Sequence, residues 1–314
     1  MRHSLYWDAF ELRIDETVNA LQSNRIPPVR RVAVFITDAC NFKCAYCNKA
    51  NEPRIMDKEI FENAICKRYG DEAIIHITGG EPSVVSWLYP FIEENANKYR
   101  FHLNTNAYIK PPTGVKRLKI SFDSSDPDYW NLLVGKKDAF ERVAGNIKEV
   151  CKQTITSITC MLSRENYKDI PKFIDFCQKE FDGLYAIFFS VYKGTNKRFV
   201  FAPEDIEFFF NKVLPIMKDR LDPESLGLIE ETLDEKQRLI AGIRFPQNSP
   251  DEPCYISISE RVFDTAGNEY RCSHLYRDNV MQTTSDKHKK CLYGCNRRLV
   301  EFNKIVSSRL KSLI

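Results

Sequence analysis

Three cysteines within eight residues constrain this chain more than any other feature. Cys40, Cys44 and Cys47 have the spacing C-x3-C-x2-C and directly follow the apolar run Val32–Ile36. Thiolates are the standard ligands of iron–sulfur clusters, so three of them on one short loop can hold three irons of a [4Fe–4S] cube. The fourth iron is then left without a protein ligand, which indicates a reactive cluster rather than an electron carrier.

A zinc loop and buried thiols are the alternatives for these cysteines. Structural zinc sites usually combine a C-x2-C pair with a second pair elsewhere in the chain. The 3+2 spacing fits that arrangement poorly, and the pattern therefore favours an iron–sulfur cluster.

The residues around the cysteines resemble the signature of the radical S-adenosylmethionine (radical SAM) superfamily. That signature has an aromatic residue before the last cysteine, which is the position of Tyr46. In this family the amine and carboxylate of SAM bind the open iron, and one electron from the cluster cleaves SAM to a 5′-deoxyadenosyl radical. The resemblance implies a SAM-binding [4Fe–4S] cluster, handling without oxygen, and a reductant such as flavodoxin or ferredoxin.

A second segment, Gly79-Gly80-Glu81-Pro82, begins 32 residues beyond Cys47 and matches the family's motif for the SAM amino group. Glycines let the backbone approach a ligand closely. We therefore expect Gly79 and Gly80 to admit SAM and the Glu81 carboxylate to bind its ammonium. Taken alone, the segment also suits a turn.

Composition indicates a soluble enzyme. A length of 314 residues with 43% hydrophobic content suggests one large domain plus a small appendage. The 46 basic and 43 acidic residues leave a net charge of +3, which is too balanced for a nucleic-acid surface. We therefore expect no nucleic-acid partner.

The chain carries no sign of export or membrane insertion. Charged residues interrupt the apolar ones within Met1–Glu16, so no signal peptide is predicted. No stretch of about 18 uncharged apolar residues is present to span a bilayer. Eleven cysteines in such a chain indicate metal or cluster ligation rather than a disulfide framework. We expect a cytoplasmic protein without a membrane partner.

Strand-like apolar runs alternate with helical periods over the first 200 residues. The expected strands are Arg31–Thr37, Ala73–Thr78, Phe101–Thr105, Arg117–Phe122, Thr154–Leu162 and Tyr185–Tyr192, and the expected helices are Lys58–Tyr69, Val84–Tyr99, Ala139–Val150 and Tyr167–Phe181. This alternation predicts an α/β fold with a parallel sheet covered by helices. The resemblance implies an open (β/α)6 partial TIM barrel, with its active site at the carboxyl ends of the strands.

Strand parity predicts which residues face the barrel lumen, because alternate residues point to opposite faces. In the fourth strand Leu118 and Ile120 should pack on helices, so Lys119 and Ser121 should face inward. The same reasoning on all the strands places these residues inward: His76, Thr78, His102, Asn104, Asn106, Asp123, Ser157, Thr159 and Met161.

The resemblance implies a set of SAM contacts around the barrel mouth. These residues are Tyr46, Gly79, Gly80, Glu81, Pro82, Asn104, Asn106, Ser121, Asp123, Thr159 and Met161. Strand capping and barrel packing are their alternative roles. We interpret His76 and His102, which lie deeper, as satisfied interior histidines rather than catalytic ones.

The pattern changes after about residue 200. Two amphipathic helices are expected, at Pro203–Asp219 and Glu224–Ala241, and a hairpin follows with strands at Tyr255–Ile258, Val262–Asp264 and Tyr270–Cys272. A further helix is expected from Arg297.

Four cysteines accompany the hairpin, at Cys254, Cys272, Cys291 and Cys295. A hairpin ending in cysteine and a following C-x3-C loop resemble the auxiliary-cluster extension called SPASM or, when shortened, twitch. The resemblance implies one auxiliary [4Fe–4S] cluster held by these cysteines. A zinc site is the alternative, as is His274 in place of one cysteine.

The remaining cysteines of the barrel region, Cys66, Cys151, Cys160 and Cys177, are interpreted as buried packing residues. The alternative is that one of them, or a cysteine near Cys254, donates a hydrogen atom to a substrate radical.

The resemblance covers residues 31–300 and implies four parts. They are an N-terminal helical extension (1–30), a radical SAM core (31–200), a helical connection (201–250) and an auxiliary-cluster domain with a C-terminal helix (251–314). We expect an oxidoreductase that abstracts hydrogen from a substrate carbon and oxidises a small polar metabolite by two electrons, with the auxiliary cluster as electron acceptor. Peptide crosslinking or epimerisation is the runner-up, and a non-enzymatic iron–sulfur or zinc scaffold is a remote alternative.

Overall fold

One β-sheet forms the centre of this computed structural model, which describes residues 5–49, 51–192, 194–221, 223–226, 229, 254–272, 276 and 297–312. Six strands pair in parallel in the order β6-β5-β4-β3-β2-β1. They are β1 (Arg31–Phe35), β2 (Ile74–Thr78), β3 (Arg100–Thr105), β4 (Arg117–Ser121), β5 (Ile155–Leu162) and β6 (Ala186–Val191). This arrangement confirms the predicted α/β partial-barrel fold.

The C-terminal hairpin belongs to the same sheet. Its strands β7 (Glu260–Phe263) and β8 (Glu269–Tyr270) are antiparallel to each other, and β7 runs parallel to β1 with Arg31 opposite Glu260. The described sheet therefore has eight strands, and the hairpin extends the barrel wall beyond β1. The sequence predicted the hairpin but not this pairing.

The helices alternate with the strands. They are α1 (Leu5–Gln22), α2 (Lys67–Tyr69), α3 (Leu88–Glu94), α4 (Pro127–Val134), α5 (Ala139–Val150), α6 (Ile170–Glu180), α7 (Pro203–Phe208), α8 (Leu214–Arg220), α9 (Pro223–Leu226), α11 (Ile256–Ser259) and α13 (Arg297–Lys311). A π-helical segment, Ile60–Cys66, leads into α2, and another, Phe209–Val213, joins α7 to α8. Most of the predicted helix Glu224–Ala241 lies outside the described residues.

Two helices differ from expectation for local reasons. α3 begins only at Leu88, because Pro90 is tolerated in the first turn of a helix and not in its interior. α4 was not predicted, although its signals are present: Oδ1 of Asp126 accepts a 3.0 Å hydrogen bond from the Tyr129 amide, and Gly135 ends the helix with φ of 70°.

The predicted strand Tyr255–Ile258 is wrong, since Ile256–Ser259 forms the single helical turn α11. This turn buries Tyr255 and Ile256 against Ile14 and Val18 of α1 and against Phe302 of α13. Packing on two helices therefore overrides the alternating pattern of this short segment. The helices α1, α11 and α13 thus share one small apolar cluster, separate from the main core.

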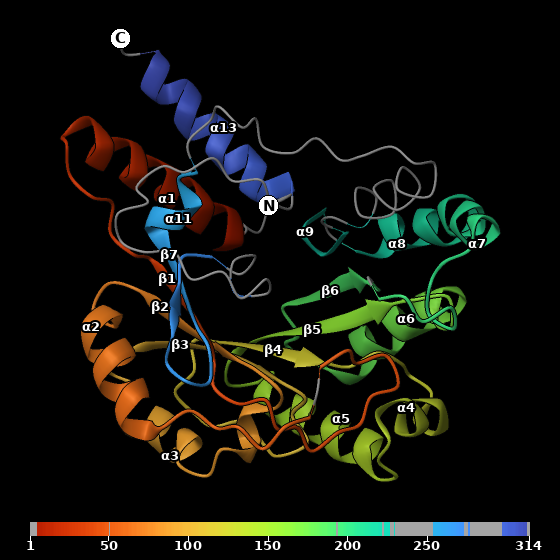
Figure 1. Cartoon of the computed structure of the whole chain (residues 1–314). Helices are drawn as coiled ribbons and strands as arrows, with labels where there is room; N and C mark the ends of the chain where they lie inside the picture. The colour runs from red at the N-terminus through yellow and green to blue at the C-terminus, as the bar shows by residue number, and fades with distance from the viewer. Residues whose placement is uncertain are drawn as a thin grey trace.

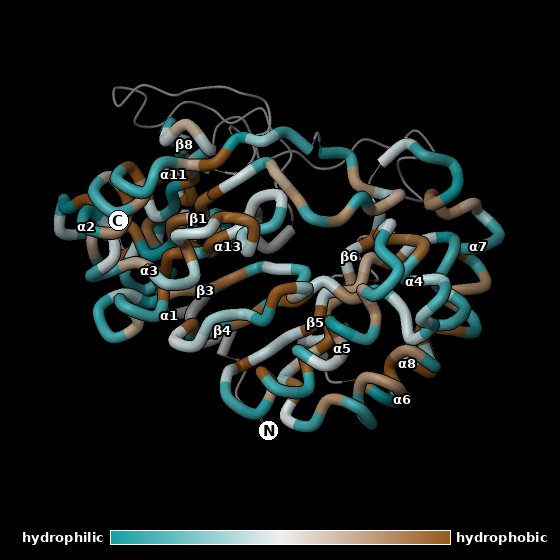
Figure 2. Tube along the Cα trace, turned by 90° about the horizontal axis from the view of Figure 1, so that it is seen from below, coloured by the Kyte–Doolittle hydropathy of each residue, from teal (hydrophilic) through white to brown (hydrophobic). Residues whose placement is uncertain are grey.

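The layers are visible in the overall view. Helices α2 to α6 lie along one side of the sheet, and α1, α11 and α13 lie together at one end of it (Figure 1). The sheet face toward the helices carries buried residues such as Val34, Ile77 and Ile120. Hydrophobic residues accordingly follow the strands, while hydrophilic ones occupy the outward turns of the helices (Figure 2).

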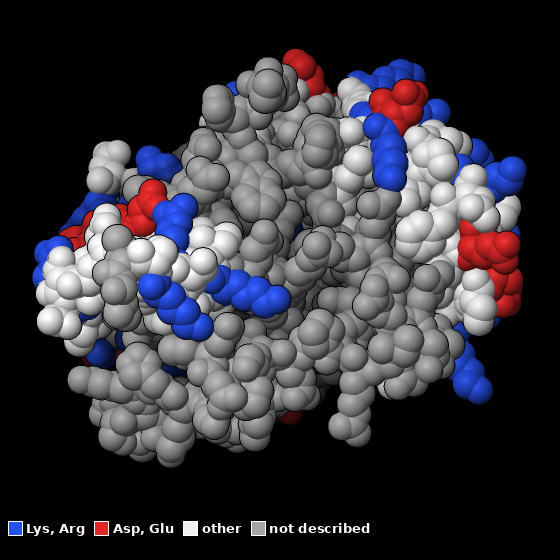
Figure 3. All heavy atoms as spheres, turned by 90° about the horizontal axis from the view of Figure 1, so that it is seen from above, with Lys and Arg blue, Asp and Glu red and all other residues white. Residues whose placement is uncertain are grey.

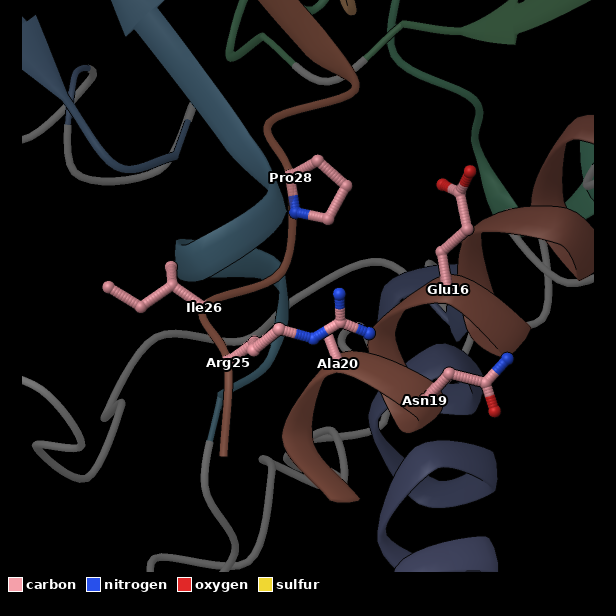
Figure 4. A pocket seen from close by; sticks show the side chains of 6 residues that line it. All are labelled: Glu16, Asn19, Ala20, Arg25, Ile26 and Pro28. Atoms are coloured by element: carbon pink, nitrogen blue, oxygen red, sulfur yellow. The ribbon is translucent and has the colours of Figure 1, made fainter. Parts of the chain in front are cut away.

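The described surface mixes charges of both signs, with basic and acidic side chains on both flanks of the molecule (Figure 3). Among the described helices, none has the length and apolar character needed to cross a membrane. A hollow of about 250 Å³ lies between α1 and the segment that follows it (Figure 4). It is lined by Glu16, Asn19, Ala20, Arg25, Ile26 and Pro28, none of which is a predicted site residue.

Candidate active site

The cysteine loop follows β1 and is held by backbone contacts on both sides. The amides of Lys43 and Ala45 donate hydrogen bonds of 2.9 Å and 2.8 Å to carbonyls at the end of α4. On the other side, Asn51 pairs with the backbone of Cys40 through bonds of 2.8 Å and 3.0 Å. The loop is therefore anchored to the barrel by protein contacts on both sides.

The three thiols of this loop have the chemistry of a cluster ligand set, although among the described residues no three His, Cys, Asp or Glu side chains are placed so as to hold a metal ion. Cys40 and Cys44 are half-buried and Cys47 is exposed, and none of them forms a disulfide. Burial, followed by the nearby Asp123 carboxylate, raises the pKa of Cys44 to about 12, and burial also raises the pKa of Cys40. A metal that binds a thiol deprotonates it, so cluster binding would release the protons of Cys40 and Cys44. Three soft ligands on one loop are the donor set that iron–sulfur clusters use.

The Gly79-Gly80 turn lies directly against the cysteine loop. Amides of Gly80 and Glu81 donate hydrogen bonds of 2.6 Å and 2.8 Å to the carbonyls of Thr37 and Ala39. A Cβ on Gly79 would lie 2.4 Å from the Thr37 oxygen, and one on Gly80 would lie 2.2 Å from the Ala39 oxygen. The glycines are thus required for the approach of two protein loops, and their predicted contact with SAM stays a prediction.

The Glu81 carboxylate is buried and engaged within the protein. Oε1 accepts hydrogen bonds from the Ser83 amide at 2.9 Å and from the Thr105 hydroxyl at 2.7 Å. Oε2 accepts a 2.6 Å bond from the amide of Asn106, and burial raises the pKa of Glu81. Glu81 therefore joins the turn after β2 to the end of β3, and its predicted contact with the SAM ammonium stays a prediction.

Asn106 carries this connection onward to the cysteines. Its side-chain Nδ2 donates a 2.7 Å hydrogen bond to Oδ1 of Asn41, which lies within the cysteine loop. Thr105 and Asn41, which the sequence did not single out, are therefore part of the site's framework. The position of Asn41 directly after the first cysteine was the only feature of the sequence that could have indicated its role.

A second network joins three of the predicted residues. The Tyr46 hydroxyl donates a 2.7 Å hydrogen bond to Oδ2 of Asp123, while the Met161 amide donates a 2.7 Å bond to Oδ1. Asp123 is almost fully buried, and that burial raises its pKa to about 6. The cysteine loop, β4 and β5 are thereby linked through one carboxylate.

The carbonyl oxygen of Gly79, in the turn beside the cysteine loop, accepts a hydrogen bond from the side chain of Lys49. Its ammonium donates a 2.7 Å hydrogen bond to the carbonyl oxygen of Gly79 and lies 4.8 Å from the ring centre of Phe35. A carbonyl that binds one ammonium here can bind another, so this position fits the amino group of SAM. The sequence reasoning had not included Lys49.

The inner face of the sheet carries polar groups that lack partners. Oδ1 of Asn104 and Oγ1 of Thr159 are buried without a hydrogen bond, and Ser121 of β4 is exposed. Leaving a buried polar atom unpaired costs about 1–3 kcal/mol. These atoms therefore fit the hydroxyls or ring nitrogens of a bound nucleoside, as SAM would supply.

Comparison with protein families finds a match for the part of the chain that contains the cysteine loop and the glycine turn. The model of the radical SAM superfamily aligns with residues 34–177, which run from β1 through α6. Residues 34–177 form a radical SAM domain. Its cluster loop, glycine turn and polar inner face are the features described above, and the family implies a [4Fe–4S] cluster and SAM.

Curated relatives of the radical SAM domain include cyclases. A GTP 3′,8-cyclase of Shewanella denitrificans is 27% identical over 180 residues, covering 50% of this chain and 52% of the relative. A probable GTP 3′,8-cyclase of Methanocaldococcus jannaschii is 27% identical over 198 residues, covering 57% and 65%. The chain thus spans about half to two thirds of the length of these relatives.

Solved structures share the fold over most of the chain. Streptococcus suis SuiB bound to the precursor peptide SuiA has a TM-score of 0.57 at 16% identity, covering 91% of this chain and 69% of the other. The structure of anSMEcpe with AdoMet and the Cp18Cys peptide has a TM-score of 0.54 at 17% identity, covering 90% and 84%. These likenesses show a common fold.

The second group of cysteines is described only in part. Cys254 and Cys272 both pack against the small cluster formed by α1, α11 and α13, while Cys291, Cys295 and His274 lie outside the described residues. Nδ2 of Asn303 lies 3.9 Å from the sulfur of Cys254, and its Oδ1 accepts a 2.9 Å hydrogen bond from the Tyr255 amide. The structure thus brings two of the four predicted ligands to one cluster of residues.

The other cysteines are confirmed as buried packing residues. Cys66, Cys151, Cys160 and Cys177 are at most 6% exposed and belong to the main core. Cys160 alternates with the inward residues Thr159 and Met161, so it lies on the helix-facing side of β5. These positions do not suit hydrogen-atom donation to a substrate in the lumen.

Proposed function

We propose that this radical SAM enzyme cleaves SAM at the cluster of Cys40, Cys44 and Cys47 and abstracts a hydrogen atom from a substrate carbon held at the inner face of the barrel. The main observation in support of this proposal is the attachment of the glycine turn to the cysteine loop. Hydrogen bonds from the amides of Gly80 and Glu81 hold the glycine turn, whose Gly79 carbonyl accepts from an ammonium, against the start of the loop that carries the three cysteines.

The cluster supplies one electron for reductive cleavage of SAM when it is bound. The protein's residues provide the rest of the site. Gly79 presents its carbonyl to an ammonium, and the Tyr46–Asp123 pair fixes the loop on the barrel. Asn104 and Thr159 offer unpaired polar atoms to the nucleoside. A flavodoxin or ferredoxin would supply the electron.

For the net reaction we propose a two-electron oxidation of a small polar metabolite, with an auxiliary [4Fe–4S] cluster at Cys254, Cys272, Cys291 and Cys295 as the electron acceptor. The joint packing of Cys254 and Cys272 supports this assignment. The soft donor of a thiolate suits iron–sulfur ligation, and the neighbouring Asn303 amide provides a polar contact to one sulfur.

Peptide modification is the second candidate. The observation in its favour is the fold shared with SuiB, solved with its precursor peptide, and with anSMEcpe, solved with a peptide. The curated relatives act, by their names, on GTP, which makes a nucleotide a further substrate class to test.

The test uses the full chain reconstituted anaerobically and reduced with dithionite. With SAM it should form 5′-deoxyadenosine, and with a true substrate it should transfer deuterium from that substrate into 5′-deoxyadenosine. Deuterated small metabolites, peptides and GTP form three arms of the screen. Transfer from a peptide or from GTP would replace the metabolite proposal, and absence of 5′-deoxyadenosine would refute the radical SAM activity itself.

A further inference from the structure

The inner face of β4 carries two cations in an unusual setting. Arg117 and Lys119 alternate with Leu118 and Ile120, which are buried on the helix side. Lys119 stands between Asn104 of β3 and Ser157 of β5 in the sheet register. Both basic side chains therefore point to the lumen side. They lie closer to the amino end of β4 than Ser121, which is at the barrel mouth.

No carboxylate among the described residues neutralises either cation. Arg117 lies over the rings of Tyr185 and Phe188 at 5.7 Å and 5.5 Å, and the Lys119 ammonium lies 5.5 Å from the same Phe188 ring. Burial, then Arg117 and Arg31, lower the pKa of Lys119 to about 8. Lys119 and Arg117 are half-buried, and a partly desolvated cation beside other cations is held at an energetic cost, which an anionic ligand would offset.

Three carboxylates on the strands or at the barrel mouth already have other partners. Glu260 at the start of β7 pairs with Arg13 at 2.8 Å and with Arg31 at 3.7 Å. The Glu81 and Asp123 carboxylates accept hydrogen bonds from the loops at the barrel mouth. The inner face also carries Arg100 at the start of β3 and two histidines, His76 and His102, whose rings lie 6.4 Å apart.

A second, independent observation points to a ligand. The Ser157 hydroxyl, on the strand next to Lys119, is completely buried and has no hydrogen-bond partner. A hydroxyl can donate to an oxyanion, as ammonium and guanidinium groups do. Two unneutralised cations and an unpaired donor on adjacent strands form a recognisable anion-binding set.

We propose that Lys119, Arg117 and Ser157 bind an oxyanion of the substrate, a phosphate or a carboxylate, in the lumen of the barrel. This inference rests on the proposed function and deepens it, because it makes the substrate an anionic metabolite. It also gives the substrate a fixed orientation relative to SAM, since the anionic end is held in the lumen while the opposite end faces the cluster loop.

The experiment titrates inorganic phosphate and, separately, succinate into the reconstituted, SAM-bound full chain at pH 7 by isothermal calorimetry. At least one anion should bind saturably, and the one that binds identifies the source of the oxyanion. Lys119→Met should weaken that binding by about tenfold or more, equivalent to ~1.4 kcal/mol. Lys119→Arg should retain most of it, because the charge is kept.

Lys116→Met is the matched control, because Lys116 immediately precedes β4 but is exposed to solvent. It should bind the anion as the wild type does. Binding of neither anion, or equal binding by Lys119→Met and the wild type, would overturn the proposal.

A measurement on the unmodified protein covers the case in which Lys119→Met does not fold. Anion binding should raise the pKa of Lys119. The charged and titratable groups on the same face of the described strands are Arg31, His76, Arg100, His102, Arg117 and Glu260. At pH 8.5 binding should therefore take up protons, seen as a heat that depends on the ionisation enthalpy of the buffer. Saturable binding without proton uptake would overturn the role of Lys119.

These titrations are independent of SAM cleavage. Formation of 5′-deoxyadenosine without anion binding would refute the anion site alone. Anion binding without 5′-deoxyadenosine would refute the proposed function alone.

Discussion

The Tyr46 hydroxyl donates a 2.7 Å hydrogen bond to Oδ2 of Asp123, which joins the cysteine loop to the end of β4 across 77 positions of sequence. Asp123 is 2% exposed and receives its other hydrogen bond from the Met161 amide. One buried carboxylate thus sets the position of the cluster loop relative to two strands of the barrel.

Tyr46→Phe should therefore destabilise the protein. It leaves Oδ2 of a buried carboxylate without its donor, which costs about 1–3 kcal/mol in the free energy of unfolding. Anaerobic urea denaturation measures this loss. Tyr108→Phe is the control, because Tyr108 bonds to Asp138 at an exposed position and its loss should cost less than about 0.5 kcal/mol. Equal effects of the two changes would contradict the structural role of Tyr46.

Gly80→Ala should separate the glycine turn from the cysteine loop. The added methyl would lie 2.2 Å from the Ala39 carbonyl oxygen, and overpacking of this kind costs about 1–3 kcal/mol. We expect a lower melting temperature and reduced iron retention.

Gly145→Ala provides the matched control for this change. Gly145 lies inside α5 and has no heavy atom within 4 Å of an added Cβ. Alanine there should stabilise the helix by about 0.5–1 kcal/mol, with unchanged iron content. A Gly80→Ala variant as stable as the wild type would show that the two loops are not held together as described.

The two inner-face histidines predict a loss of stability in mild acid. Burial lowers the pKa of His102 to about 4 and holds that of His76 well below its usual value of 6.5. Below pH 6.5 the unfolded chain therefore binds protons that the folded chain does not, so the free energy of unfolding falls as the pH drops from 6.5 to 4.

The double variant His76→Asn with His102→Asn isolates this contribution from that of the carboxylates. Between pH 6.5 and 4 it should lose about 1–3 kcal/mol less stability than the wild type, as measured by denaturant unfolding at each pH. Parallel pH profiles for the two proteins would mean that the histidines are protonated in the folded state.

If the chain holds an auxiliary cluster as well as the SAM-binding one, its iron content should be that of two clusters. The reconstituted wild type should contain about eight irons per chain, and the variant Cys254→Ala with Cys272→Ala about four. That variant should still cleave SAM but form no product. Cys151→Ala, which alters a core cysteine, should retain about eight irons. A wild type with about four irons, or loss of SAM cleavage in a variant whose first cluster is spectroscopically intact, would contradict this assignment.

Local patterns in the sequence predicted most of the barrel. The six parallel strands follow from their apolar runs, and the inward set on β4 follows from the alternation of Leu118 and Ile120 with polar neighbours. The spacing of Cys40, Cys44 and Cys47 together with the glycine turn indicated the family. These features depend on residues close together in sequence, where periodicity and spacing are informative.

Contacts between distant segments could not be predicted in the same way. The pairing of β7 with β1, the packing of Tyr255 on α1 and α13, and the bond from Lys49 to Gly79 depend on how elements assemble in space. The close approach of the Thr37–Ala39 backbone to the two glycines was not predicted for this reason, whereas their contact with SAM stays a prediction. Glycine spacing shows that a close approach occurs, but not which partner approaches.

The cysteine loop is proposed to hold a cluster that cleaves SAM. The most direct measurement is the yield of 5′-deoxyadenosine from SAM and dithionite, compared between the anaerobically reconstituted chain and its Cys40→Ala, Cys44→Ala, Cys47→Ala triple variant. We predict steady formation by the wild type and none above background by the variant, which should keep about four irons at its second cluster. Formation of 5′-deoxyadenosine by the triple variant, or its absence from the fully loaded wild type, would contradict the account.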